Sequence, residues 1–227
     1  MALARELYYQ LAVRRFGMFT RIELNPPAPV RDLVLAALET DEGAAYLSGG
    51  GDAPGPRRAE KAELADQAVA LLVGSAPLLL EYFSVEIVAE AGSPATLAAL
   101  PALLPTSGSG ATPPMDAALP LFLLRLAADV DFEQEAACFE GVARELGRYY
   151  ASLPEEVGGG GGGGGGDEAE GALPPGMSRV AADAVQFTLY PAFRAYLAPP
   201  AELVEDEQSF VAIAALEKLY KVFERSC

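Results

Sequence analysis

Apolar residues recur at helical spacing at the start of the chain. Leu3, Leu7 and Leu11 are four residues apart, which places them on one face of an α-helix. The pattern predicts a helix over residues 3 to 16 that ends at Gly17, because glycine often follows the last helical position. This helix therefore has one apolar face that another part of the structure must cover.

The following segments show strand and helix patterns in turn. Residues 18 to 24 alternate apolar and polar side chains as a half-buried strand does, and three prolines between positions 26 and 29 should break that strand. A second helix is predicted over residues 30 to 39, directly after the last of these prolines. Residues 85 to 88 alternate again, which predicts a second strand.

The middle of the chain is rich in helix-forming residues. Residues 58 to 72 are mostly Ala, Glu, Leu and Lys and predict a long helix, with a further turn after Pro77. Residues 119 to 130 are apolar enough for a buried helix. Asp131, with Gln134 three positions later, is typical of a helix start. The apolar face of that next helix consists of Phe139, Val142, Leu146 and Tyr149.

The last part of the chain mixes both patterns. Residues 178 to 197 have helical spacing; Pro191 should kink this helix, and the two prolines at 199 and 200 should end it. The tail from residue 210 begins with the strand-like FVAI and continues with the helical LEKLYKVFERSC. Helices combined with a few short strands predict an α+β fold.

Three segments are predicted to be connectors. Residues 48 to 56 and 105 to 116 are rich in Gly, Pro and Ser and predict loops. Nine consecutive glycines occupy positions 158 to 166, and glycine loses the most backbone entropy on ordering, so residues 155 to 176 are predicted to be a disordered linker. A phosphate-binding loop would need Lys and Ser or Thr after the glycines, whereas Asp167 and Glu168 follow them here.

Composition restricts the class of protein. With 227 residues and 51% hydrophobic content, the chain can form one globular domain, with room for two lobes. No apolar run reaches the roughly 18 residues of a membrane span, and charges interrupt the first fifteen residues, so we expect neither a membrane span nor a signal peptide but a cytosolic or nuclear site. The net charge of -16 repels a phosphate backbone, so we expect no direct DNA binding.

The residue types that most catalytic sites need are scarce. There is no histidine, which excludes Ser-His, Cys-His and His-metal arrangements, and the two cysteines exclude a disulfide framework or a zinc site of four cysteines. An enzyme that acts alone is therefore not expected, and neither is a cofactor of its own. The carboxylates Glu202, Glu205, Asp206 and Glu207 could bind magnesium or calcium, but they lack the ligand spacing of a calcium loop and favour a solvated loop.

The two cysteines differ in their surroundings. Cys138 lies among Ala136, Ala137 and Phe139, which favours a core position. Cys227 is the last residue, at the end of a helical pattern. Its chemistry alone leaves two interpretations open, a spare exposed thiol or a metal ligand that reaches across an interface.

The order of several sequence blocks resembles a known family. The tail LYKVFER with its final Cys, the opening RELYYQLAVRRFGMF and the following PAPVRDLVLAALE resemble the carboxy-terminal dimerisation domain of the MutL homolog 1 family of eukaryotic DNA mismatch repair proteins. KAELAD, EYFSVEI, LPLFLLRLAADVDFEQEAACFEGVARELGRYYA and YLAPPAELVEDE agree in the same order. Ser226 is inserted where the family ends in FERC, and the family's amino-terminal ATPase and the domain's opening strands are missing, so the chain is expected to be a fragment.

The resemblance implies a domain of two lobes. Residues 1 to 25 and 178 to 227 would form the dimerising lobe, and residues 29 to 150 the outer lobe. The residues facing the partner would be Leu7, Tyr8, Leu11, Leu219, Tyr220, Phe223, Glu224 and Arg225. Cys227 would act in trans as a metal contact at the partner's nicking site, which would hold zinc or manganese.

These implications define the functional hypothesis. The chain is expected to pair with a PMS-type MutL homologue in the nucleus, in mismatch repair and in meiotic recombination, to contact other mismatch repair proteins, and to help complete the partner's endonuclease site. Two alternatives stay open. One is a stand-alone adaptor that docks short peptides on its outer lobe, and the other is a hydrolase with a carboxylate-bound metal.

Overall fold

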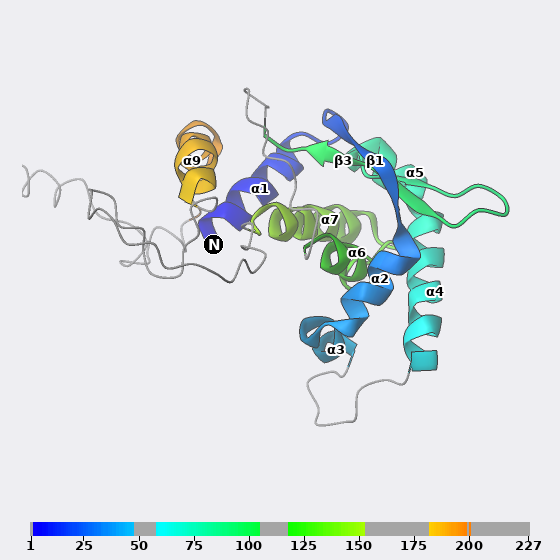
Figure 1. Cartoon of the computed structure of the whole chain (residues 1–227). Helices are drawn as coiled ribbons and strands as arrows, with labels where there is room; N and C mark the ends of the chain where they lie inside the picture. The colour runs from blue at the N-terminus through cyan, green and yellow to red at the C-terminus, as the bar shows by residue number, and fades with distance from the viewer. Residues whose placement is uncertain (1, 48–57, 105–117, 153–181, 199, 201–227) are drawn as a thin grey trace, which may run out of the picture.

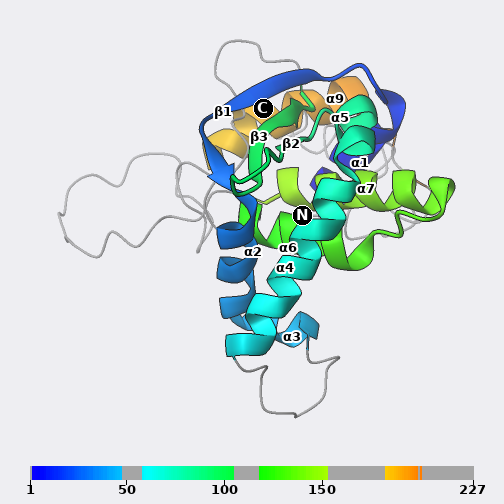
Figure 2. The same cartoon turned by 90° about the vertical axis from the view of Figure 1, so that its right-hand side faces the viewer.

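Helices dominate the described structure, and a small antiparallel sheet lies along one side of it (Figure 1), which confirms the α+β prediction. The computed structural model describes residues 2–47, 58–104, 118–152, 182–198 and 200. In chain order the elements are α1 (Ala2–Arg14), β1 (Thr20–Pro29), α2 (Val30–Glu39), α3 (Asp41–Leu47), α4 (Arg58–Gly74), α5 (Ala76–Phe83), β2 (Glu86–Val88), β3 (Thr96–Ala102), α6 (Ala118–Asp129), α7 (Glu135–Tyr150), η1 (Ala184–Leu189) and α9 (Tyr190–Tyr196). In Figures 1 and 2 the sheet lies above α6 and α7, and α2 and α4 run down from it side by side.

The described sheet has the strand order β1-β3-β2, and both pairs are antiparallel. β1 and β2 lie where alternation predicted strands. The central strand β3 was not predicted, because its sequence TLAALPA contains helix-forming Ala and Leu and a proline instead of alternating β-branched residues. β3 is a strand because both of its neighbours pair with it.

β1 continues through the prolines that were predicted to break it. The strand ends only at Pro29, and its register against β3 shifts between Glu23 and Ala28. Proline cannot donate a hydrogen bond to a neighbouring strand, but β1 lies at the edge of the sheet, where one side needs no partner. The strand is irregular where the prolines lack N–H donors, and it continues on the other side of them. The predicted break is therefore corrected to a bulged edge strand.

The core forms where α1 crosses α7. Ala4, Leu7, Tyr8, Leu11 and Ala12 of α1 are buried, as are Val142, Leu146 and Tyr149 on the predicted apolar face of α7. An aromatic cluster closes the end of this layer: the ring of Phe16 lies 5.2 Å from the rings of both Phe83 and Phe139. Gly17, in the left-handed region at φ 70°, then turns the chain and donates its N–H to the Tyr82 carbonyl at 2.9 Å.

Helices α2, α4 and α6 pack against one another beneath the sheet. α2 has the bounds that the sequence predicts, whereas the turn expected after Pro77 is a full helix, α5, with that proline in its first turn. No single helix in the described ranges is long and apolar enough to cross a membrane; only the pair Glu60–Gly74 and Ala76–Phe83, bent by 56°, passes the test of length and composition together.

Side-chain oxygens accept backbone hydrogen bonds near the starts of two helices. Thr40 Oγ1 accepts the N–H of Gly43 at 3.0 Å and begins α3, a short helix that the sequence did not predict. Asp131 Oδ1 accepts the N–H groups of Glu133 at 2.9 Å and Gln134 at 3.3 Å. It therefore caps a turn before α7, whose own N-cap residue, Gln134, makes no capping side-chain hydrogen bond, so the predicted cap is corrected by one turn.

A π-helical turn lies directly before Pro191 in this helical segment. Residues of η1 form a π-helix, and the N–H of Tyr190 bonds to the carbonyl of Val185, five residues back. Pro191 then falls in the first turn of α9. Proline lacks an N–H and its ring crowds the preceding turn, so a wider turn directly before it removes both conflicts.

Candidate partner interface

Hydrogen bonds and a cation–π contact hold the end of α9, the last described helix, against α1. Gln10 of α1 pairs with Ala198 in both directions: its Nε2 donates to the Ala198 carbonyl at 2.6 Å, and its Oε1 accepts the Ala198 N–H at 3.0 Å. Arg14 Nη1 donates to the Tyr196 carbonyl at 3.0 Å, and the Arg15 guanidinium lies 5.7 Å from the centre of the Tyr196 ring. These contacts set the position of α9 on α1 (Figure 1).

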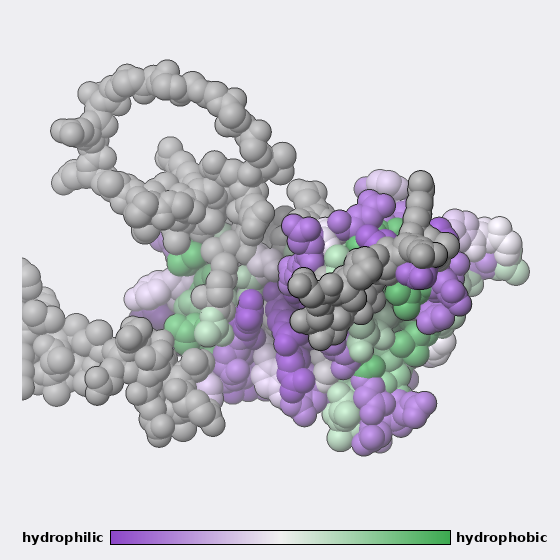
Figure 3. Space-filling model, turned by 90° about the horizontal axis from the view of Figure 1, so that it is seen from below, coloured by the Kyte–Doolittle hydropathy of each residue, from purple (hydrophilic) through white to green (hydrophobic). Residues whose placement is uncertain are grey.

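The other side of this helical unit presents aromatic side chains to solvent. Phe187 is 66% exposed and Tyr190 is 60% exposed, whereas Leu189 and Ala192 are buried. Seen from below in Figure 3, hydrophobic side chains show at the left side of the molecule, where Figure 1 places α1 and α9. Exposed large aromatics on an anchored helix are typical of a surface that a partner covers. We call η1, α9 and this aromatic pair the aromatic face.

The sequence analysis predicted partner-facing residues other than Phe187 and Tyr190. It included residues 178 to 197 in the dimerising lobe but did not select Phe187 and Tyr190. Their position in a helical segment, away from its apolar positions, was the available sign that they are exposed. Leu7, Tyr8 and Leu11 of α1 lie inside the chain against α7. They are core residues here, and burial raises the pKa of Tyr8 to about 12.

Several predicted site residues lie outside the described part of the chain. They are Leu219, Tyr220, Phe223, Glu224, Arg225 and Cys227, together with the acidic cluster at 202 to 207 and the glycine-rich linker at 155 to 176. Their interface and metal roles stay predictions. The two loops predicted at 48 to 56 and 105 to 116 also lie wholly outside it.

Cys138 is fully buried, which confirms its predicted core position. Burial, with a smaller contribution from the charge of Asp131, raises the pKa of its thiol, so the neutral form packs as a small apolar group. Within the described ranges no three His, Cys, Asp or Glu side chains are grouped so that they could hold a metal ion.

Comparison with known proteins identifies the family. The family described as "DNA mismatch repair protein Mlh1 C-terminus" matches residues 1–227. The chain belongs to this family. Among its relatives, DNA mismatch repair protein Mlh1 of Dictyostelium discoideum is 30% identical over 229 residues, which cover 98% of this chain and 24% of the relative. DNA mismatch repair protein MLH1 of Saccharomyces cerevisiae is 29% identical over 230 residues, covering 97% of this chain and 26% of the relative.

The match confirms the family resemblance drawn from the sequence blocks. The Mlh1 C-terminal family covers the whole chain, including the tail, while the chain spans about a quarter of the length of the two relatives. The aromatic face is therefore a surface of an Mlh1 C-terminal domain.

Proposed function

We propose that this chain is a dimerisation subunit of a nuclear DNA mismatch repair complex, in which it pairs with a second MutL homologue of the PMS type. The same subunit would serve meiotic recombination and contact further repair proteins. Membership of the Mlh1 C-terminal family over residues 1–227 supports the proposal, as do relatives named DNA mismatch repair protein Mlh1. No catalytic activity of the chain alone is proposed, since the sequence holds no histidine.

The aromatic face is the observation that carries the proposal. Phe187 and Tyr190 are largely exposed, although hydrogen bonds from Gln10 to Ala198 fix the carboxy-terminal end of this helical segment to α1. An aromatic side chain buries about 150–250 Å² when it is fully covered, and each Å² is worth roughly 25 cal/mol. A partner that covers both rings would therefore gain several kcal/mol.

Pairing with a PMS-type homologue tests this surface. The chain and the partner's carboxy-terminal domain are co-expressed, and their association is measured by size-exclusion chromatography with light scattering and by titration. The double substitution Phe187→Ala and Tyr190→Ala should weaken pairing by about 2 kcal/mol or more, roughly a thirtyfold rise in Kd. The matched control is Leu71→Ala with Leu80→Ala, which removes two exposed apolar side chains, 40% and 37% exposed, from α4 and α5.

Two results would contradict the proposed surface. Pairing of the double aromatic variant with unchanged Kd would show that the partner binds elsewhere, and loss of pairing in the control would move the interface to α4 and α5. Nicking of supercoiled DNA by the purified chain with manganese would instead support the hydrolase alternative.

We also propose that Cys227 contributes in trans to a zinc or manganese site of the partner's endonuclease. Its support is the end-anchored LYKVFER tail with a terminal cysteine, a thiolate being a good zinc ligand at about 2.3 Å. Cys227→Ser should lower the nicking rate of the heterodimer and its metal content but leave pairing intact. Deletion of Ser226, which restores FERC, should keep or raise the rate. Wild-type nicking and metal content in Cys227→Ser would reduce the chain's role to dimerisation.

A further inference from the structure

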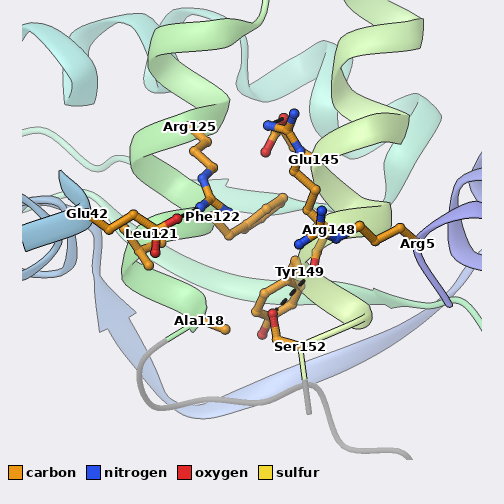
Figure 4. A pocket seen from close by; sticks show the side chains of 10 residues that line it. All are labelled: Arg5, Glu42, Ala118, Leu121, Phe122, Arg125, Glu145, Arg148, Tyr149 and Ser152. Atoms are coloured by element: carbon orange, nitrogen blue, oxygen red, sulfur yellow. Dashed lines mark hydrogen bonds and ion pairs between the residues drawn. The ribbon is translucent and has the colours of Figure 1, made fainter. Parts of the chain in front are cut away.

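A polar pocket with a cavity volume of about 170 Å³ lies between α6 and α7, with α1 and α3 at its mouth (Figure 4). Charged side chains from all four helices line it: Arg5 from α1, Glu42 from α3, Arg125 from α6, and Glu145 and Arg148 from α7. The pocket is separate from the residues of the aromatic face.

Two buried polar groups of α7 face this pocket with hydrogen-bonding capacity left over. Glu145 is 2% exposed; its Oε1 accepts a hydrogen bond from Arg148 Nη1 at 2.7 Å, while its Oε2 has no partner among the described residues. The hydroxyl of Tyr149, which is equally buried, also has none. Buried polar groups are almost always paired, so two unpaired ones lining one cavity point to a ligand.

The arginines around the pocket offer more donors than the protein uses. Arg125 forms an ion pair with Glu42, and Arg148 forms one with Glu145 and a longer one, at 3.7 Å, with Asp129. Arg5 has no ion pair in the described part of the chain, although it lines the same cavity. Arg5 thus brings to the pocket an exposed guanidinium whose N–H donors are not used by an ion pair among the described residues.

We propose that this pocket binds a carboxylate group, held by the guanidinium of Arg5 and the hydroxyl of Tyr149 beside the carboxyl of Glu145. A guanidinium presents a planar fork of N–H donors that matches the two oxygens of a carboxylate. The Tyr149 hydroxyl donates a further hydrogen bond. A doubly charged phosphate fits less well, because Glu42 and Glu145 would repel the second charge.

Binding should take up a proton at Glu145. The charged groups that act on this carboxyl are Arg148 and Arg144 on its own helix and Asp129 and Arg125 on α6, while Arg5 and Glu42 line the same pocket. Burial raises the pKa of Glu145, and Arg148 only partly opposes this. A second carboxylate beside it favours the protonated form, in which Glu145 donates a hydrogen bond to the ligand.

The proposal is tested by amide NMR titration of the isotope-labelled 227-residue chain. The probes are acetate, as a free carboxylate, and doubly capped glutamate, as a peptide-borne one, with doubly capped glutamine as the neutral control. Both carboxylates should shift the amide resonances of Arg5, Tyr149 and Ser152, and these shifts should saturate. Their affinity should rise on acidification, by up to about tenfold per pH unit while Glu145 is ionised in the free chain.

Four variants separate binding from folding. Arg5→Ala should lower the affinity for both carboxylates by about tenfold. Arg21→Ala should leave both affinities unchanged, because the exposed ion pair of Arg21 with Glu86 lies outside the pocket. Tyr149→Phe should weaken binding without changing its pH dependence, and its ring can keep its stacking on Phe122 at 4.9 Å. Glu145→Gln should remove the pH dependence.

One result would narrow the range of ligands, and three would contradict the proposed carboxylate site. Acetate that binds while capped glutamate does not would restrict the site to free carboxylates. Capped glutamine binding as well as capped glutamate, phosphate binding more tightly than acetate, or carboxylate binding that Arg5→Ala leaves unchanged would each overturn it.

Discussion

At the residue scale, Gly147 marks the closest approach of α1 and α7. A Cβ at this position would lie 2.9 Å from the carbonyl oxygen of Arg5 and 3.2 Å from the nitrogen of Tyr9, both of which are backbone atoms that cannot move independently of α1. The glycine therefore lets two helix backbones meet. Nothing in the periodicity of α7 marks this position, because a helix contact that needs a missing side chain leaves no apolar pattern.

Gly147→Ala should destabilise the chain. Overpacking costs about 1–3 kcal/mol, and the better helix propensity of alanine returns up to about 1 kcal/mol, so we expect a net loss of roughly 1–2 kcal/mol in urea unfolding. Gly74→Ala is the control, because nothing lies within 4 Å of a Cβ at that position. Equal free energies of unfolding for both variants would show that α1 and α7 can move apart without loss.

Glu145 makes stability depend on pH. Burial raises its pKa above the ordinary value of 4.5, so the folded chain binds this proton more tightly than the unfolded chain does. Its contribution to the free energy of unfolding is therefore fully present below pH 4.5 and is lost as pH rises through the folded pKa.

Glu145→Gln should flatten that dependence and should unfold at higher urea than the wild type near neutral pH, by about 1 kcal/mol, because a neutral side chain avoids the cost of a buried charge. Arg148 is half-exposed and keeps Asp129 as a partner. The comparison is Asp66→Asn, since Arg31 lowers the pKa of that exposed carboxyl and its removal should not produce the same flattening. An unchanged slope for Glu145→Gln would contradict the assignment.

At the element scale, the helices were the more predictable part of the fold. α2 begins and ends at the residues that the sequence indicated, because a proline precedes it and its apolar face is regular. β3 could not be recognised, since its Leu, Ala and Pro residues become a strand only through pairing with β1 and β2. The π-turn of η1 was equally hidden, because Pro191 predicts a conflict with a helix but not which geometry resolves it.

The contact of α9 with α1 can be loosened without unfolding the core. Gln10→Ala removes both hydrogen bonds to Ala198, each worth about 0.5–1.5 kcal/mol. Hydrogen exchange at residues 190 to 196 should become roughly five- to a hundredfold faster, while exchange in α7 stays unchanged. Gln67→Ala, on the exposed side of α4, is the matched control. Equal acceleration in α7 would mean that α9 unfolds only together with the core.

At the scale of the whole molecule, the order of the sequence blocks gave the family, and the Mlh1 C-terminal match confirms it. The candidate interface was harder to predict. Periodicity shows that Leu7, Tyr8 and Leu11 need a cover, but it cannot show whether the cover is a partner or another helix of the same chain. In this fold α7 packs against α1, and Leu7, Tyr8 and Leu11 are buried within the chain.

The glycine run between α7 and η1 should be dispensable for folding. Shortening a flexible connection changes closure entropy only logarithmically, so deletion of residues 158 to 166 should leave the free energy of unfolding within about 1 kcal/mol of wild type. Thermal and urea unfolding measure this. A loss of several kcal/mol would show that these residues make contacts of their own.

The pairing of Gln10 with Ala198 joins positions 188 residues apart in the chain. On a ribosome, α1 emerges long before its partner segment, so the aromatic face cannot be assembled until nearly all of these residues have been synthesised. A chain that stops before Ala198 would lack the backbone groups that Gln10 binds. If the proposed pairing surface holds, such a truncated chain should therefore pair more weakly than the chain that reaches Ala198.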